Sequence, residues 1–245
     1  MCGRSQLLIT VEALFARYRV EPPDGGVPLP LDGFPRWSVA PTQSVPCILE
    51  SDGARVLQAM RWGFPMTWLA RQGKDPWSRP LINAKSEAAA DKRTWAAALR
   101  ERRCVVPVTA FYEWLRAGRK RYPVEFSPAS GALLNVAGIW QRFERGGDAV
   151  DCVALLTTAA NREMRPVHDR MPVILGSDAA VAAWIGPERG GELLRTLMAP
   201  APAGTLRLRP MHTRLNHWSA AGDDLAQADW SPGHEGVPAL DGGVA

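Results

Sequence analysis

Apolar residues recur with helical spacing in several parts of the chain. The segment "TVEALFARYRV", residues 10–20, predicts an amphipathic helix. Its apolar face comprises Val11, Leu14, Phe15 and Tyr18. The alanine-rich segment 85–103, "KSEAAADKRTWAAALRERR", predicts one longer helix with an apolar stripe through Ala88, Trp95 and Leu99. Shorter helices are expected within residues 177–186 and 190–198.

Short apolar runs separated by Pro, Gly and Asn predict many strands. The expected strands cover residues 37–51 (interrupted by Pro41), 54–64, 104–115, 121–128, 133–143, 151–161 and 205–216. Residues 65–80 read as an irregular loop. Long alternation of strands and helices is absent, so we expect an α+β fold with a curved, mostly antiparallel sheet or barrel core flanked by helices.

The chain has 245 residues, enough for one large domain. We expect residues 1–220 to form that domain and residues 221–245, which are polar and rich in Gly, Asp and Pro, to be a flexible tail. No stretch approaches the roughly 20 apolar residues that span a bilayer. No secretory signal is visible either. The pattern favours a cytoplasmic protein, without membrane contact.

The positively charged residues are mostly arginine rather than lysine. The net charge is +4, and 25 Arg stand against 4 Lys, with 10 Trp. Arg binds phosphates through two parallel hydrogen bonds, and aromatic rings stack on unpaired bases, so this composition suits single-stranded nucleic acid. A genome rich in G and C would also favour Arg over Lys.

The cysteines are far apart, and one occupies a special position. Cys47, Cys104 and Cys152 lie in apolar runs and are expected to be buried, inert thiols. No Cys/His cluster has the spacing of a metal site, so we expect no metal and no cofactor. Cys2 directly follows Met1. If Met1 is removed, Cys2 carries a free α-amine beside its thiol, and the two can attack one aldehyde in turn. The alternative is that position 2 has no chemical role.

Three further polar residues lie in apolar or turn-like surroundings. Asn83 either caps the helix that follows or holds a bound group. Glu113 lies between two aromatic residues, where a desolvated carboxyl can transfer protons, or else faces solvent. His168 is either structural or a proton shuttle. With Cys2, these residues fit either a cysteine hydrolase or an aldehyde trap.

The order and approximate spacing of several motifs resemble those of one known family. The motifs are "MCGR", "RWSVAPTQSVPCI", "MRWGFPMTW", "INAKSEA", "RRCVVPVTAFYEW", "LLNVAGIW", "LLTTAAN" and "VHDRMPVIL". They span Cys2 to about Asn216 and resemble the SRAP family of SOS-response-associated abasic-site processing proteins. The resemblance implies a single SRAP domain.

The resemblance also implies an activity. Members bind abasic sites in single-stranded DNA, where the opened sugar exposes an aldehyde. The mature amino-terminal Cys closes a thiazolidine on it, giving a DNA–protein crosslink that protects the lesion during the response to DNA damage. The family is also described as thiol autopeptidases, here removing Met1 alone, and weak lyase activity can accompany the imine. We therefore expect a monomer whose partner is single-stranded DNA.

The family's functional residues map onto this sequence at matching motif positions. The resemblance gives Cys2 the amine and thiol, Asn83 the orientation of the sugar, Glu113 proton transfer, and His168 sugar opening and crosslink reversal. It also implies a set of DNA contacts, namely Arg4, Pro41, Trp62, Trp68, Lys85, Trp114 and Arg170. Lys85 stands where members usually have Arg, which implies a looser phosphate contact.

Two other functions compete with the covalent trap. A cysteine peptidase would use Cys2 and His168 to cleave peptides in trans and would not need DNA. A noncovalent single-stranded DNA binder would keep full function after Cys2→Ala.

Overall fold

The computed structural model describes residues 3–22, 31–131, 133–187, 191–234 and 236–240. Their strands form two sheets, and one of these sheets closes into a five-stranded barrel. The barrel strands are β3 (Ser44–Ser51), β4 (Ala54–Trp62), β6 (Arg103–Val108), β9 (Leu134–Arg145) and β10 (Asp148–Ala159). The ring runs β10–β4–β3–β6–β9 and returns to β10, and only the β4–β10 contact is parallel. The expected α+β fold with a mostly antiparallel barrel core is confirmed.

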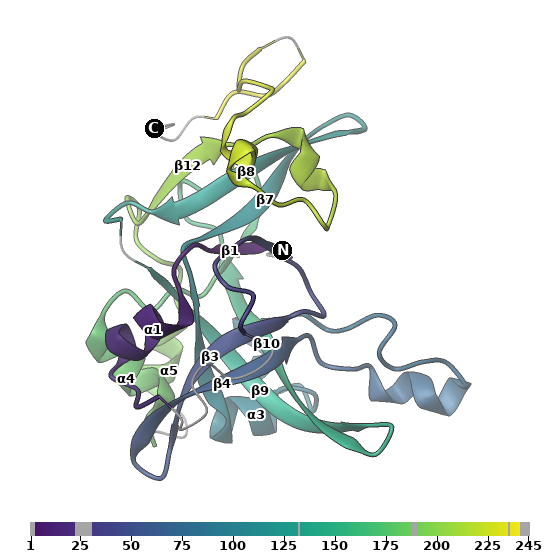
Figure 1. The fold of residues 1–245 in the computed structure, drawn as a ribbon, viewed down its shortest axis with the longest axis vertical. Coiled ribbons are helices and arrows are strands. Elements are labelled where there is room, and N and C mark those ends of the chain that lie inside the picture. Colours follow the sequence, from purple (N-terminus) through teal and green to yellow (C-terminus); the bar gives the residue numbers. More distant parts are fainter. Residues whose placement is uncertain (1–2, 23–30, 132, 188–190, 235, 241–245) are drawn as a thin grey trace.

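The second sheet is wholly antiparallel and lies above the barrel in Figure 1. Its order is β12 (Leu206–Pro210), β8 (Lys120–Pro128), β7 (Ala110–Ala117), β1 (Ser5–Leu7) and β2 (Arg36–Val39). Strand β1 thus lies where the upper sheet meets the barrel (Figure 1). The start of the described chain is therefore held at the junction of the two sheets.

One expected strand is in fact two. The run 104–115 was expected to be continuous, but it belongs to β6 in the barrel and β7 in the upper sheet, with a break at Thr109. Strand β1 holds this corner, because the Thr109 N–H donates to the Gln6 carbonyl (2.8 Å) and the Thr109 hydroxyl donates to Gln6 Oε1 (2.9 Å). A tertiary contact from 103 residues away therefore sets the corner.

The helices pack around the barrel. Helix α1 (Val11–Tyr18) buries the four apolar residues that its spacing predicted. It lies beside α4 (Asp178–Ile185) and α5 (Glu192–Leu197) on one side of the barrel (Figure 1), and Arg17 pairs with Asp178 at 2.6 Å.

The long helix expected over 85–103 is wrong. The segment forms two short helices, α2 (Ser86–Ala89) and α3 (Ala96–Glu101), separated by turns. Both Ala89 and Trp95 are buried. At about 100° per residue, one continuous helix would point these side chains about 120° apart, whereas in the broken segment both lie in the core.

The expected loop 65–80 projects from the barrel (Figure 1) and carries a 3₁₀ helix, η1 (Thr67–Gln72). Its base is closed by reciprocal backbone hydrogen bonds between Phe64 and Leu81 (3.0 and 2.8 Å). Trp68 on η1 is 53% exposed. The arm therefore presents a large aromatic ring to solvent.

The carboxyl-terminal segment packs against the upper sheet over its described part. After η2 (Thr213–Asn216), a further 3₁₀ helix, η3 (Asp223–Ala226), buries Leu225 completely. The Trp230 indole donates to the Met211 carbonyl (2.7 Å) and contacts the Tyr122 ring. These apolar contacts are the reason that this part of the expected flexible tail lies on the domain in the structure. No helix among the described ranges is long and apolar enough to cross a membrane.

Candidate functional site at the junction of the two sheets

The first group of site residues is set by the pairing of β1 with β7. Ser5 lies opposite Phe111, and the Tyr112 N–H donates to the Arg4 carbonyl (2.9 Å). Because the pairing is antiparallel, the same register continued outward brings Gly3 opposite Glu113. Cys2 itself lies outside the described residues. Gly3, the first described residue, is thus the residue opposite Glu113.

Glu113 occupies the face of β7 that points to the main core. Side chains alternate along a strand, so Glu113 shares its face with Phe111 and Leu115, and both of these belong to the main hydrophobic cluster. The residue is only 5% exposed. Of the two alternatives for Glu113, the structure therefore shows a buried carboxyl rather than a solvated one.

Behind this strand lies a buried polar network that sequence reasoning missed. Tyr112, on the opposite face of β7, donates its hydroxyl proton to the Trp37 carbonyl (2.9 Å) and accepts a hydrogen bond from Gln6 Nε2 (2.8 Å). Gln6 Nε2 also donates to Glu125 Oε2 (3.3 Å). The same carboxylate forms an ion pair with Arg209, with 2.9 Å between Nη2 and Oε2. The sequence signal was the single carboxyl of Glu125 between the apolar residues Val124 and Phe126. The network joins all five strands of the upper sheet, on the face of β7 opposite to Glu113.

Arg4 and Trp114 meet on the same outer side of the sheet. The Arg4 guanidinium lies 5.8 Å from the centre of the Trp114 ring and donates to Ser38 Oγ (3.0 Å) and to two carbonyls of the η2 region. Arg4 is buried, and the loss of water lowers the pKa of its guanidinium. Trp114 is half-buried, and its indole donates to Asn216 Oδ1 (2.7 Å). Arg4 thus ties the start of the chain to η2 in the DNA-free protein.

The second group flanks the end of β10. Strand β5 (Asn83–Lys85) pairs parallel to β10, with Asn83 opposite Leu155 and Lys85 opposite Thr157. Strand β11 (Arg170–Pro172) pairs antiparallel on the same strand. Asn83 is half-buried and Lys85 is exposed. The two motifs "INAKSE" and "HDRMP", distant in sequence, therefore meet across one strand.

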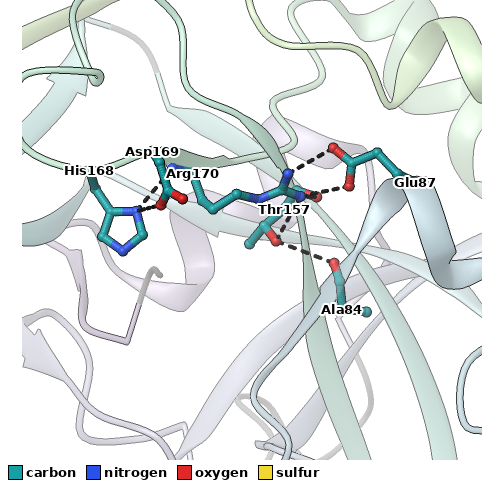
Figure 2. A network of polar contacts seen from close by, with 6 residues as sticks. All are labelled: Ala84, Glu87, Thr157, His168, Asp169 and Arg170. Carbon is teal, nitrogen blue, oxygen red and sulfur yellow. Dashed lines mark hydrogen bonds and ion pairs between the residues drawn. The ribbon is translucent and has the colours of Figure 1, made fainter.

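Arg170 is bound by a carboxylate of the protein itself. Figure 2 shows its guanidinium facing Glu87, with two hydrogen bonds of 2.8 Å each, while Nη2 also donates to the Thr157 carbonyl (2.6 Å). The hydrogen bond from Arg170 lowers the pKa of Glu87, which is therefore ionised near neutrality. Sequence reasoning did not single out Glu87. A phosphate contact at Arg170 would have to compete with this ion pair.

His168 follows a turn and lies two residues before the start of β11. Its backbone N–H donates to the Met164 carbonyl (2.9 Å), and its side chain is 27% exposed. Its Nδ1 accepts a hydrogen bond from the Arg170 backbone N–H (2.9 Å) and lies 2.9 Å from Asp169 Oδ1 (Figure 2). The His168 ring is therefore linked to the backbone of Arg170, and not to its side chain, by this hydrogen bond.

The remaining expected DNA contacts differ in exposure. Trp62 is only 1% exposed, and its indole donates to the Ile82 carbonyl (3.1 Å), so the expectation that it contacts DNA conflicts with its place in the core. Pro41 is half-buried in the turn after β2, where the Thr42 N–H donates to the Trp62 carbonyl (2.8 Å). Trp68 is the exposed ring on the arm. Trp62 therefore supports the residue before Asn83 rather than offering a stacking surface.

The expected inert thiols are buried. Cys47, Cys104 and Cys152 are free cysteines in the core, and burial raises the pKa of the Cys152 thiol to about 12. In the part of the chain that the structure describes, no three His, Cys, Asp or Glu residues gather in a way that could hold a metal ion.

A fold with a closed barrel, an appended antiparallel sheet and polar residues at their junction has known relatives. The sequence model of the family described as SOS response associated peptidase (SRAP) matches residues 1–218. The chain belongs to this family.

Named relatives cover most of the chain at modest identity. The abasic site processing protein YedK of Escherichia coli is 28% identical over 231 residues, 93% of this chain and 99% of its own. The abasic site processing protein YoqW of Bacillus subtilis is 28% identical over 221 residues, which cover 88% of this chain and 94% of YoqW. The abasic site processing protein HMCES of Xenopus tropicalis is 28% identical over 220 residues, which cover 76% of this chain and 66% of HMCES.

Solved structures share the fold. A Bacteroides thetaiotaomicron protein superposes with a TM-score of 0.80 over 94% of this chain and all of its own, at 19% identity. A Bordetella bronchiseptica protein does so with a TM-score of 0.70 over 86% of this chain and all of its own, at 26% identity.

Proposed function

We propose that this protein recognises abasic sites in single-stranded DNA and becomes crosslinked to them through Cys2, after removal of Met1. Membership of the family and relatives named abasic site processing proteins support the substrate. The protein then shields the lesion during the response to DNA damage.

The chemistry needs no oxidant, metal or cofactor. The Cys2 α-amine attacks the aldehyde of the opened sugar, and loss of one water gives an imine. The thiol sulfur then bonds to the imine carbon, while its proton passes to the imine nitrogen, which closes the five-membered thiazolidine. Until the ring closes, the imine also allows slow β-elimination, a weak lyase side reaction.

The observation that carries this proposal is the register of β1 on β7. The hydrogen bond from the Tyr112 N–H to the Arg4 carbonyl (2.9 Å) fixes the strand two residues after Cys2. Continued outward, this register places Gly3, the residue that follows Cys2 in the chain, opposite a buried carboxyl, Glu113. A buried carboxyl beside an amine and an aldehyde can carry protons for imine formation.

We assign the other site residues to binding and orientation. Asn83, held in register on β10, orients the sugar, and His168 assists its opening. Pro41, Trp68, Lys85 and Trp114 contact the strand, with exposed Lys85 on phosphate and Trp68 on a base. Arg4 and Arg170 are largely buried, and they contribute positive charge to the site from beneath the surface.

Denaturing gel electrophoresis tests the proposal directly. Protein shown by mass to begin at Cys2 is mixed with single-stranded DNA carrying one abasic site. A heat-stable shifted band is expected that undamaged DNA and Cys2→Ala protein do not give. Absence of the band from wild-type protein would refute the covalent trap.

Cys2→Ser is the matched variant, because it keeps the amine and removes the sulfur. It should form an imine that borohydride traps, without a heat-stable band in the absence of borohydride, and it should incise the strand more than wild type. A heat-stable Cys2→Ser band without borohydride would show that the stability of the crosslink does not depend on the sulfur. Peptide cleavage that needs no DNA would instead indicate a peptidase, and equal function in Cys2→Ala would indicate a noncovalent binder.

A further inference from the structure

The His168 Nδ1 atom faces two groups that make opposite demands on it. The Arg170 backbone N–H lies 2.9 Å away and can only donate, which requires a lone pair on Nδ1. Asp169 Oδ1 lies 2.9 Å away and, as a carboxylate, can only accept, which requires a proton on Nδ1. A neutral imidazole can satisfy one of these contacts but not both.

The backbone donor is the fixed one of the two. Arg170 lies in β11, where it pairs with Ala159, and the neighbouring Asp169 carbonyl accepts from the Ala160 N–H (3.0 Å). The Asp169 side chain is 87% exposed and can rotate into water, where such a contact contributes little. The neutral ring therefore keeps its lone pair on Nδ1 and its proton on Nε2.

The Arg170 side chain adds a second anchor to this backbone. Its guanidinium makes two 2.8 Å hydrogen bonds to Glu87 and one of 2.6 Å to the Thr157 carbonyl. Thr157 in turn reaches the Ala84 carbonyl at 3.4 Å (Figure 2). One guanidinium thus connects α2, β10 and β11. The Arg170 side chain is 13% exposed, so loss of the Glu87 charge would leave a mostly buried cation with weaker partners.

We propose that Glu87 is a positioning residue, which grips Arg170 so that its backbone N–H holds neutral His168 as the Nε2–H tautomer. The ring then presents a hydrogen-bond donor at Nε2, not a base. The sequence describes both Glu113 and His168 as groups able to transfer protons. With this tautomer, Glu113 is the base and His168 donates a hydrogen bond to the sugar. This last assignment rests on the proposed function, whereas the tautomer does not.

Nitrogen-15 NMR of the DNA-free protein tests the tautomer without any reaction. Spectra are recorded at about pH 8.5, roughly two units above the ordinary histidine pKa of about 6.5, with His168 assigned by its loss in His168→Asn. Wild type should show an unprotonated Nδ1 and a protonated Nε2. Glu87→Gln should shift both signals toward a mixture of tautomers.

A remote variant of the same kind is the control. Glu192 pairs with Arg195 on the exposed surface of α5, so Glu192→Gln should leave the His168 signals unchanged. Thermal unfolding checks that each variant is folded. A protonated Nδ1 in wild type, or a folded Glu87→Gln protein with wild-type His168 signals, would overturn the proposal.

Crosslinking rates complete the test. Glu87→Gln should form the crosslink roughly tenfold more slowly, a fraction of what acid–base groups contribute in total. Glu87→Asp, which keeps the charge, should recover part of both the rate and the NMR signature. Failure of wild type to crosslink would count against the proposed function and leave the tautomer assignment standing.

Discussion

Replacing Trp62 by Ala should lower the stability of the fold, whereas replacing Trp68 by Ala should weaken DNA binding. Trp62 is 1% exposed and Trp68 is 53% exposed, although both lie in segments expected to contact DNA. Truncating a buried Trp to Ala costs about 3–5 kcal/mol. The Ile82 carbonyl, which accepts from Trp62, also accepts from the Leu155 N–H at 3.1 Å, so it keeps one partner and adds little to this cost.

These energies translate into measurable shifts. For a chain of this size, about 1 kcal/mol corresponds to roughly 2–4 °C, so Trp62→Ala should lower the Tm by roughly 6–20 °C. Trp68→Ala changes an exposed ring, and its stability should stay within about 0.5 kcal/mol of wild type. Loss of one stacked base costs about 1–3 kcal/mol, so Trp68→Ala should weaken binding of single-stranded DNA roughly five- to hundredfold.

Thermal denaturation and fluorescence anisotropy measure the two effects. Both are made in a Cys2→Ala background, and binding is measured on undamaged single-stranded DNA, which offers no aldehyde to the α-amine, so that binding stays noncovalent. A Trp62→Ala protein with wild-type Tm and weak DNA binding would refute the burial argument. Trp68→Ala protein with unchanged affinity would remove the arm from the proposed DNA surface.

Three further predictions concern single groups. Glu113→Gln should slow crosslinking about 10²–10⁴-fold with unchanged DNA affinity, measured under single-turnover conditions; a rate near wild type would contradict its role as base. Because Arg170 depresses the folded-state pKa of Glu87, this pair stabilises the fold above the unfolded pKa of about 4.3, and the contribution is lost as pH falls through the lower folded value. Urea unfolding of Glu87→Gln should therefore show a shallower acid-side loss than wild type; equal slopes would contradict the coupling. With its pKa raised to about 12, Cys152 should not react with a disulfide reagent in native Cys2→Ala protein and should react once unfolded; rapid native labelling would contradict its burial.

Local patterns were sufficient wherever a segment's own periodicity matched its surroundings. The apolar face of α1 was predicted residue by residue, because one side of a short helix packs on one core surface. The strands β8, β9 and β10 were likewise predicted from short apolar runs and the turn residues between them. The closed sheet followed from the number of short strands and the absence of long crossovers.

Tertiary contacts decided what periodicity could not. The break at Thr109 is held by hydrogen bonds to Gln6, and the break between α2 and α3 accompanies the burial of both Ala89 and Trp95. A sequence window contains neither the partner strand nor the core that receives both side chains.

For the candidate site, too, the sequence showed the types of reactive side chain, and the tertiary structure decided their surroundings. The candidate groups Cys2, Asn83, Glu113 and His168 could be named from the sequence, because residue type determines what a side chain can do. Exposure, pairing and proton position could not be read, because they depend on neighbours brought from elsewhere in the chain. Thus Trp62 lies in the core, and Glu87, 83 residues before Arg170, holds the cation that the sequence assigned to DNA.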